Sequence, residues 1–234
     1  MNGKSTQKST APADTTMMGV THDALRRDLG RTDDVLQASR IDDRQRGAVA
    51  DHTQWMMAFL HAHHRAEDHG LWPLVRRTDP ESAPLLDQMG ADHSRITPEV
   101  DRLDAAAATF HDDGSLGARI EFTRSLATLE DVLLPHLRLE EDEAMPLVSR
   151  ALTAAQWVRW DRTENIDPKS KWELGIEGQW LGDSLDPQRR DILVHLVGPV
   201  TRFVLLHLFD GPYRRACAVR WGPDVPVGPL DAPR

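Results

Sequence analysis

One thirteen-residue pattern occurs twice in the sequence, and this repeat constrains the fold more than any other feature. Residues 63–75 and residues 136–148 both follow the pattern H-x-R-x-E-[D/E]-x-x-x-x-P-L-V. A further histidine precedes each copy at nearly the same distance, since His22 lies 41 positions before the first copy and His93 lies 43 positions before the second. The unit of a histidine, a long spacer and His-x-x-x-Glu is therefore duplicated, which is typical of a metal site built from two halves.

The spacing inside each copy suits an α-helix that presents two ligands to one point. Residues four apart share a helix face, so His63 with Glu67, and His136 with Glu140, can each offer a nitrogen and a carboxylate oxygen. A single pair of this kind is common on solvated helix faces in a chain with 11 histidines. Both pairs, however, lie on apolar stripes of helical period, where an ionisable group without a partner is costly.

Four segments carry such a stripe, and each has a histidine near its middle. We expect helices near 17–40, 43–72, 81–110 and 116–149, joined by short polar breaks that favour antiparallel neighbours. In an antiparallel four-helix bundle six side chains would converge on one interior layer, as they do in carboxylate-bridged metal centres. The proline of each repeat should kink or end its helix just beyond the site. The predicted metal ligands are His22, His63, Glu67, His93, His136 and Glu140.

The composition and the rest of the chain suggest one all-α domain with additions. We expect a disordered tail over residues 1–16, the bundle over 17–149, and a Trp-rich helical extension packed on the bundle over 150–234. The net charge of −9 without a basic stripe argues against nucleic-acid binding. The single cysteine, Cys217, excludes a disulfide framework and cysteine-rich metal sites. Because the first residues lack an apolar signal segment, we expect a cytoplasmic protein.

The segment 192–209 is the most apolar part of the extension, and its eighteen residues approach the length of a membrane span. His195, Arg202 and His207 fall inside it, and Gly198 and Pro199 would interrupt a helix. A membrane span is therefore the least favoured interpretation. A contact with a membrane surface or with a second copy in a homodimer comes next. The favoured interpretation is a kinked helix packed on the bundle.

The donor types indicate which metal the predicted ligands suit. Imidazole suits iron, zinc and copper, whereas carboxylate suits iron and manganese, so four imidazoles with two carboxylates best fit two irons or one iron with one manganese. Zinc usually needs fewer ligands in a closed tetrahedron. Because the ligands must be neutral imidazoles and ionised carboxylates, metal loading should weaken as the pH falls toward the histidine pKa.

The ordered histidines, the two His-x-x-x-Glu pairs and the following Pro-Leu resemble the hemerythrin-like, HHE cation-binding family over residues 17–149. The resemblance implies a four-helix bundle with two non-haem irons, bridged by Glu67 and Glu140 and by a solvent-derived oxo or hydroxo group. Oxygen-carrying hemerythrins differ in two respects. They have a second histidine where this chain has Thr97, and their last carboxylate corresponds to Glu141. Fewer nitrogen donors would leave open or water-filled positions, which argues against simple reversible oxygen carriage.

The other polar residues near the pairs are expected to support the site or to be solvated. His64 follows His63 and lies about 100° around the helix, so we expect it at the surface or beside the site without coordination. Asp68 and Glu141 should be solvated or should contact a ligand. His52 can reach the bundle interior, although its spacing does not predict a contact with the metal.

Three functions remain open on these grounds. The leading one is a di-iron protein that binds or senses oxygen, nitric oxide or peroxide, or holds iron. The second is a di-iron enzyme that decomposes peroxide with catalase-like or peroxidase-like activity, because a bound metal can polarise an oxygen ligand. The third is a metal-free interaction module that uses the C-terminal segment. Exchange of a bound ligand without turnover would favour the first, and sustained peroxide loss would favour the second.

Overall fold

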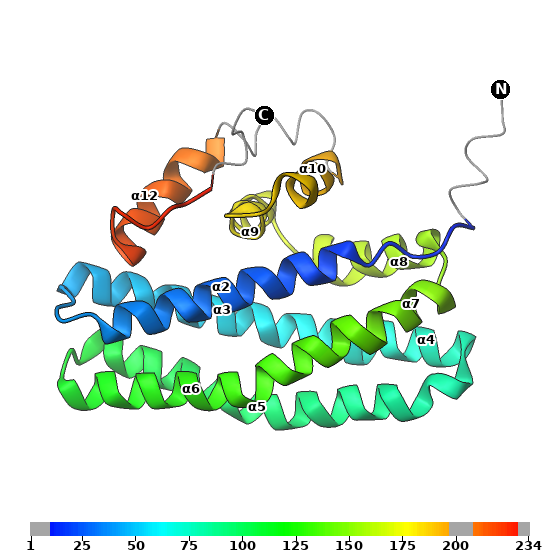
Figure 1. Cartoon of the computed structure of the whole chain (residues 1–234), viewed down its shortest axis with the longest axis horizontal. Coiled ribbons are helices and arrows are strands. Elements are labelled where there is room, and N and C mark those ends of the chain that lie inside the picture. Colours follow the sequence, from blue (N-terminus) through cyan, green and yellow to red (C-terminus); the bar gives the residue numbers. More distant parts are fainter. Residues whose placement is uncertain (1–9, 197–207, 229–234) are drawn as a thin grey trace.

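The computed structural model describes residues 10–196 and 208–228, and this part of the chain contains helices and no β-strand. Four long helices run side by side along the molecule, each antiparallel to the one before it in sequence (Figure 1). This arrangement confirms the expected all-α, antiparallel four-helix bundle. The four helices are α2 (Thr16–Gln37), α3 (Asp43–Ala66), α5 (Ala83–Asp112) and α6 (Leu116–Leu139).

Two of these helices begin at side chains that cap their first turn. Asp42 accepts a hydrogen bond from the backbone N–H of Gln45 at the start of α3, and Ser115 accepts one from Ala118 at the start of α6. Such a cap satisfies one of the backbone donors that have no partner inside the helix. These two caps therefore set the helix starts that the sequence predicts at residues 43 and 116.

Both copies of the repeat contain a wider, π-helical turn that begins at the glutamate. In the first copy α3 continues through η1 (Glu67–Leu71) into α4 (Trp72–Thr78), and in the second α6 continues through η3 (Glu140–Ala144) into α7 (Met145–Ala151). The first of these helices thus runs past its expected end near residue 72 to Thr78, whereas the second ends at Ala151, close to the expected 149. Each helix widens for one turn before its proline and then continues.

The wider turn has a physical cause in the proline. Pro73 has no backbone N–H, and its ring would meet the carbonyl four residues earlier in a regular α-helix. A π-turn shifts the pairing by one residue, so that Trp72 N–H bonds to the carbonyl of Glu67. In the second copy Met145 N–H bonds to Glu140 in the same way. The repeat therefore encodes an identical local distortion directly after each proposed ligand pair.

Residues from the predicted tail are paired with a distant part of the chain. Residues 1–9 lie outside the described part, but Ala13 is buried and donates a backbone hydrogen bond to Leu152 over 3.0 Å. Ala154 donates to Ala11 over 2.7 Å. The segment before α2 thus differs from the expected disordered tail, because short-range composition does not show that residues 152–154 will provide backbone partners.

The C-terminal helices lie on one side of the bundle, over α2 and α3 (Figure 1). Capping boxes at Thr153 and Ser170 start the first and third of these elements. Buried Trp180 and Trp221 belong to the same apolar cluster as residues of α2, α3 and α6. The elements are α8 (Ala154–Asp161), η4 (Arg162–Ile166), α9 (Lys171–Gly182), α10 (Pro187–Leu196) and α12 (Asp210–Trp221).

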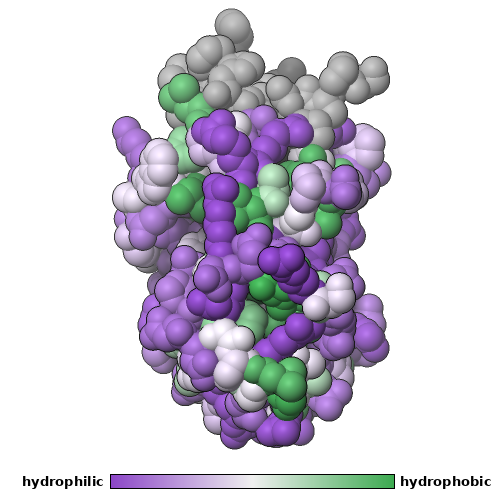
Figure 2. All heavy atoms as spheres, turned by 90° about the vertical axis from the view of Figure 1, so that its left-hand side faces the viewer, coloured by the Kyte–Doolittle hydropathy of each residue, from purple (hydrophilic) through white to green (hydrophobic). Residues whose placement is uncertain are grey.

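Most of the apolar segment 192–209 lies outside the described residues, so its predicted kinked helix is not part of this description. Among the helices of the described ranges, none combines the length and hydropathy needed to cross a bilayer. Figure 2 shows one end of the molecule, where the surface is mostly hydrophilic and hydrophobic side chains form small separate patches.

Candidate metal centre

A layer of buried polar side chains crosses the bundle between two apolar layers. On each bundle helix the histidine that sequence analysis singled out is buried, and buried apolar residues flank it along the helix. A polar layer in such surroundings is stable only if its groups have partners. The flanking pairs are Met18 and Leu25, Leu60 and Leu71, Met89 and Ile96, and Leu133 and Ala144.

One group of donors joins helices α2, α3 and η3. His22, His63 and Glu140 each offer an atom, and these atoms all lie within 4.8 Å of one another. His22 Nε2 is 3.3 Å from Glu140 Oε2. Glu67 also reaches this group, because its Oε1 lies 3.2 Å from His63 Nε2. The four side chains come from three parts of the chain, yet they point to the same small volume.

A second group of donors lies beside the first. His64, His93 and His136 offer nitrogen atoms that again lie within 4.8 Å of one another. Glu67 Oε2 is 3.5 Å from His93 Nε2, and Glu140 Oε2 is 3.7 Å from His136 Nε2. Each glutamate therefore approaches imidazoles of both groups. The arrangement suits two cations that share two carboxylates.

The structure brings all six predicted residues together and adds His64, which sequence analysis expected at the surface or beside the site. Its side chain is buried and stacks on His93, with ring centroids 4.1 Å apart. The rotation of about 100° between neighbouring residues turns His64 toward α5, whereas His63 contacts His22 on α2. Two adjacent histidines can thus contact two neighbouring helices. The His63-His64 pair is the sequence feature that could have indicated this.

His64 also changes the expected number of nitrogen donors. Thr97 lacks the imidazole of oxygen-carrying hemerythrins, and its hydroxyl donates to the carbonyl of His93 over 2.9 Å. His64 provides a fifth imidazole from α3 instead. Among the other candidates, His52 is buried but bonds to Asp28 and not to this centre. The centre therefore has as many imidazoles as it would have with a histidine at position 97.

Many donor atoms at the centre have no hydrogen-bond partner among the described residues. They are the Nε2 atoms of His22, His63 and His64 and both carboxylate oxygens of Glu67 and Glu140. A buried polar atom without a partner costs about 1–3 kcal/mol, and more if it is charged. So many unsatisfied atoms directed at one another are a strong sign of a bound cation. Their nitrogen and oxygen chemistry, without sulfur, fits iron or manganese.

Two outer carboxylates orient the imidazoles. Glu141 Oε1 lies 2.8 Å from His22 Nδ1 and also accepts from Arg26 Nη1 over 2.8 Å. Asp68 Oδ1 lies 2.8 Å from His93 Nδ1. When Nδ1 donates to a carboxylate, Nε2 keeps its lone pair for a metal. Asp68 and Glu141, each next to a glutamate of the centre, thus hold the rings in the orientation that coordination requires.

Without a metal, the pKa values of the side chains at the centre are shifted in different directions. Burial lowers the pKa of His63 to about 3, helped by His22, and burial lowers that of His136 to about 4. Burial also disfavours a charged His22, but Glu140 and Glu141 outweigh it and raise the pKa to about 9. Burial and the charge of Glu140 raise the pKa of Glu67 well above its usual range. Cation binding would therefore release protons.

A family model described as the hemerythrin HHE cation binding domain matches residues 14–148. The chain belongs to this family. The match confirms the resemblance stated from the sequence, and membership implies that the domain binds cations. The hemerythrin domain spans α2 to α7, whereas α8 and the following helices lie beyond the match. Comparison with curated proteins and with solved structures gives no match.

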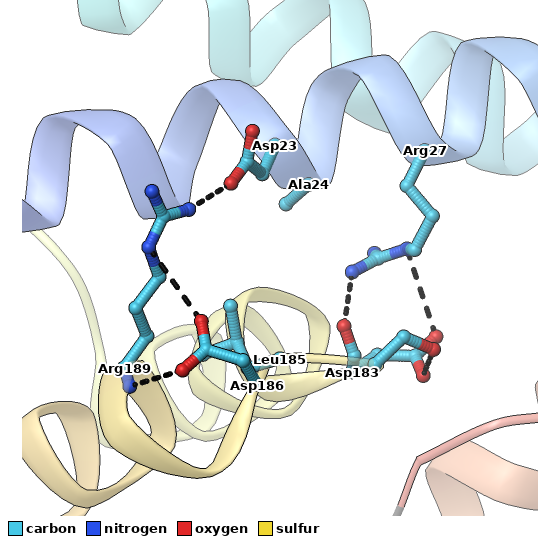
Figure 3. A pocket seen from close by; sticks show the side chains of 8 residues that line it. Asp23, Ala24, Arg27, Asp183, Leu185, Asp186 and Arg189 are labelled. Atoms are coloured by element: carbon cyan, nitrogen blue, oxygen red, sulfur yellow. Dashed lines mark hydrogen bonds and ion pairs between the residues drawn. The ribbon is translucent and has the colours of Figure 1, made fainter.

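A surface pocket between α2 of the hemerythrin domain and the C-terminal segment is a weaker candidate for function (Figure 3). Its charged side chains are already paired with one another. Arg27 Nη1 donates to the carbonyl oxygen of Asp183 over 2.7 Å, and Arg189 pairs with Asp23 and with Asp186. These pairs hold the C-terminal segment on α2, and they leave no unsatisfied charge that would attract a ligand.

Proposed function

We propose that this hemerythrin-like domain holds two non-haem iron ions and binds or senses a small oxygen-containing ligand. The observation that carries the proposal is the set of seven buried donor side chains that converge from four helices with so many unpaired atoms. Glu67 and Glu140 would be shared by the two ions. The terminal nitrogen ligands would be His22 and His63 for one ion and His64, His93 and His136 for the other.

The unequal histidine groups suggest where an external ligand would bind. The first group has two imidazoles, and the second has three. An ion held by His22 and His63 would therefore keep an open position, as metals that bind exchangeable ligands do. The apolar layers on both sides exclude bulk water, which strengthens electrostatic interactions inside the site. Oxygen, nitric oxide and peroxide are small enough for such a site.

Turnover of peroxide is the second candidate function. It is favoured by one oxidisable side chain a single ring away from the centre, because Phe59 stacks on His63 and Trp180 contacts Phe59. Bound iron would polarise the peroxide oxygen atoms. Outside the centre, the chain's own contribution would be to hold the imidazoles through Asp68 and Glu141 and to keep the site dry.

Metal stoichiometry combined with optical spectroscopy tests these proposals. Purified protein is loaded with ferrous iron without oxygen, and its spectrum is recorded before and after addition of oxygen, nitric oxide or hydrogen peroxide. We expect two irons per chain and a new absorption band with at least one of these ligands, whereas metal-free protein should show none. Elemental analysis of protein grown with both metals distinguishes two irons from iron with manganese. Failure to bind iron or manganese would overturn the proposal.

Ligand exchange is distinguished from catalysis in the same preparation. Sustained oxygen evolution or peroxide loss by the iron-loaded protein would establish the enzyme. A stable spectral change that reverses when the ligand is removed would establish the binding or sensing protein. The unloaded protein is the control for both measurements.

A further inference from the structure

A continuous row of aromatic rings leads from the candidate metal centre to the C-terminal helices. Phe59 stacks on His63, with ring centroids 6.0 Å apart and planes at 13°. Trp180 of α9 lies edge-on to Phe59 at 4.9 Å and to Trp55 at 5.0 Å. Trp55 itself stacks on Phe59 at 6.0 Å. A tryptophan from outside the hemerythrin domain is thus one ring away from a proposed iron ligand.

Trp180 has a buried negative charge beside its indole nitrogen. The side chain is fully buried, and its Nε1–H donates to Asp28 Oδ2 over 2.9 Å. His52 Nε2 lies 2.7 Å from the same oxygen, and Arg27 donates to the other carboxylate oxygen over 2.8 Å. Burial disfavours an ionised Asp28, but His52 and Arg27 hold its pKa far below the usual range. Asp28 is therefore a permanent anion.

The pairing of an indole with an anion has a chemical consequence. Tryptophan and tyrosine are among the side chains that lose an electron most readily, and the loss leaves positive charge on the ring. An ionised carboxylate within hydrogen-bond distance stabilises that charge, most strongly where water is excluded. Arg27 and Arg31 both pair with the other carboxylate oxygen, Oδ1. His52, at the oxygen that accepts from the indole, is uncharged because burial and nearby Arg220 lower its pKa to about 4. Trp180 is thus easier to oxidise than an indole whose N–H meets a neutral acceptor.

We infer that Trp180 is a redox-active residue that supplies an electron to the metal centre when hydrogen peroxide is reduced there. The inference rests on the proposed di-iron site. Peroxide takes two electrons and two protons to give two waters, with the protons drawn from solvent. Bound iron would supply one electron and the indole of Trp180 the second, and two one-electron reductants from solution would restore both. The indole becomes a radical cation, and its N–H proton stays on the ring, hydrogen-bonded to Asp28.

Trp55 connects the row of aromatic rings to solvent, so that electrons can enter the row there. Its side chain is only half-buried, whereas Trp180 is fully enclosed. An electron from Trp55 refills Trp180, and a one-electron reductant in solution then refills Trp55. The row thereby carries oxidising equivalents away from the imidazoles and carboxylates of the centre. It also assigns a substrate class to the site, namely soluble one-electron donors that reach the surface at Trp55.

Trp160 offers an internal comparison because it is also close to the centre. Its Nε1–H donates over 3.1 Å to the carbonyl oxygen of Ala66, the residue before Glu67. That acceptor is neutral, and Trp160 belongs to a different apolar cluster from Trp180. Proximity alone would favour oxidation of either tryptophan. The ionised carboxylate of Asp28 favours oxidation of Trp180 over oxidation of Trp160.

Electron paramagnetic resonance of the full-length, iron-loaded protein tests the inference. The protein is mixed with hydrogen peroxide and frozen within milliseconds to seconds. We expect a tryptophan radical, identified by the change in its hyperfine structure when the indoles are deuterated. Trp180→Phe should lose the signal. Trp160→Phe and Trp172→Phe should keep it, the latter because Trp172 is exposed on the same helix and contacts no ring of the row.

Mass spectrometry of the wild-type protein gives a second readout that requires no variant. After peroxide treatment without a reductant, oxidised indoles should be found at Trp180 and Trp55 and not at Trp160. A radical that survives Trp180→Phe, or oxidation confined to Trp160, would overturn the inference. Peroxide loss at normal iron content without any radical would overturn it and leave the proposed function intact. Failure to bind iron would overturn both.

Discussion

The two copies of the repeat share their backbone geometry but not their surroundings. In both, the glutamate begins a π-turn, and the acid that follows it bonds to Nδ1 of a histidine on another helix. Asp68 in the first copy holds His93, and Glu141 in the second holds His22. The common pattern thus produces the same local structure and the same supporting contact twice.

Single positions then make the two halves unequal. His64 in the first copy corresponds to Leu137 in the second, and both are buried, but only the histidine joins the centre. Gly70 corresponds to Glu143, which is exposed. A Cβ at Gly70 would lie 2.7 Å from Trp160 Nε1, so glycine allows the C-terminal segment to pack here. The duplication gives both halves of the centre the same helical framework. Single residues and the C-terminal helices packed on one side of the bundle, here called the C-terminal cover, make the two halves different.

Removal of either shared glutamate should cause the largest loss of bound metal, and the loss should be similar for both. Glu67→Ala and Glu140→Ala each delete a carboxylate that approaches both histidine groups, so each should lose most of the bound metal. Elemental analysis after loading with iron measures the result. His61→Ala, which changes a partly exposed histidine two residues before His63, is the control and should bind as the wild type does. Metal content equal to that of the control would refute the shared-carboxylate arrangement.

His64→Leu gives the first copy the residue that the second copy has at this position. It should affect only one of the two ion sites. Because His64 belongs only to the second histidine group, we expect loss of one ion while the ion at His22 and His63 is retained. His61→Leu is the matched control. If both ions remain, His64 only supports the site, as the sequence suggested.

The pH dependence of the metal-free protein should reveal the unequal charges of the two halves. The pKa of His22 is about 9 in the folded state and near 6.5 when unfolded, so the folded state binds more protons between these values. Stability should therefore fall as the pH rises from 6.5 to 9, by at most about 3 kcal/mol. Urea unfolding at several pH values measures this effect.

The acidic side of the profile has the opposite origin. His63 has a folded-state pKa of about 3, so below pH 6.5 the unfolded state binds more protons and stability falls as the pH decreases. Glu141→Gln should weaken the loss on the alkaline side, because Glu141 helps to raise the pKa of His22. Stability that increases from pH 6.5 to 9 in the metal-free protein would contradict this account.

The smallest effect should be the difference in folding stability between Gly70→Ala and Glu143→Ala. The added methyl at Gly70 would meet the rigid, hydrogen-bonded indole of Trp160, and overpacking of this kind costs about 1–3 kcal/mol. The exposed Glu143 should tolerate alanine within about 0.5 kcal/mol. Denaturant unfolding measures both, and Trp160 fluorescence reports whether the cover moves. Equal stabilities would show that the cover does not depend on Gly70.

The bundle and the six predicted donors could be recognised from the sequence because they follow from local periodicity. Helical spacing places His63 with Glu67 and His136 with Glu140 whatever surrounds them, and the apolar stripes determine which face is buried. The proline likewise marked the position of the distortion. Its form, a π-turn that lets the helix continue, depends on packing beyond the turn.

His64 and the C-terminal cover were decided only by the tertiary structure. Whether a residue about 100° from His63 faces water or a neighbouring helix depends on where α5 packs, and this cannot be obtained from the period of one helix. The contacts of Trp160 with Ala66, and of Trp180 with Asp28, join residues far apart in the sequence. The sequence by itself determined the duplicated ligands and the helices that carry them. Tertiary packing decided the fifth imidazole and the covered side, because both require a partner from another helix.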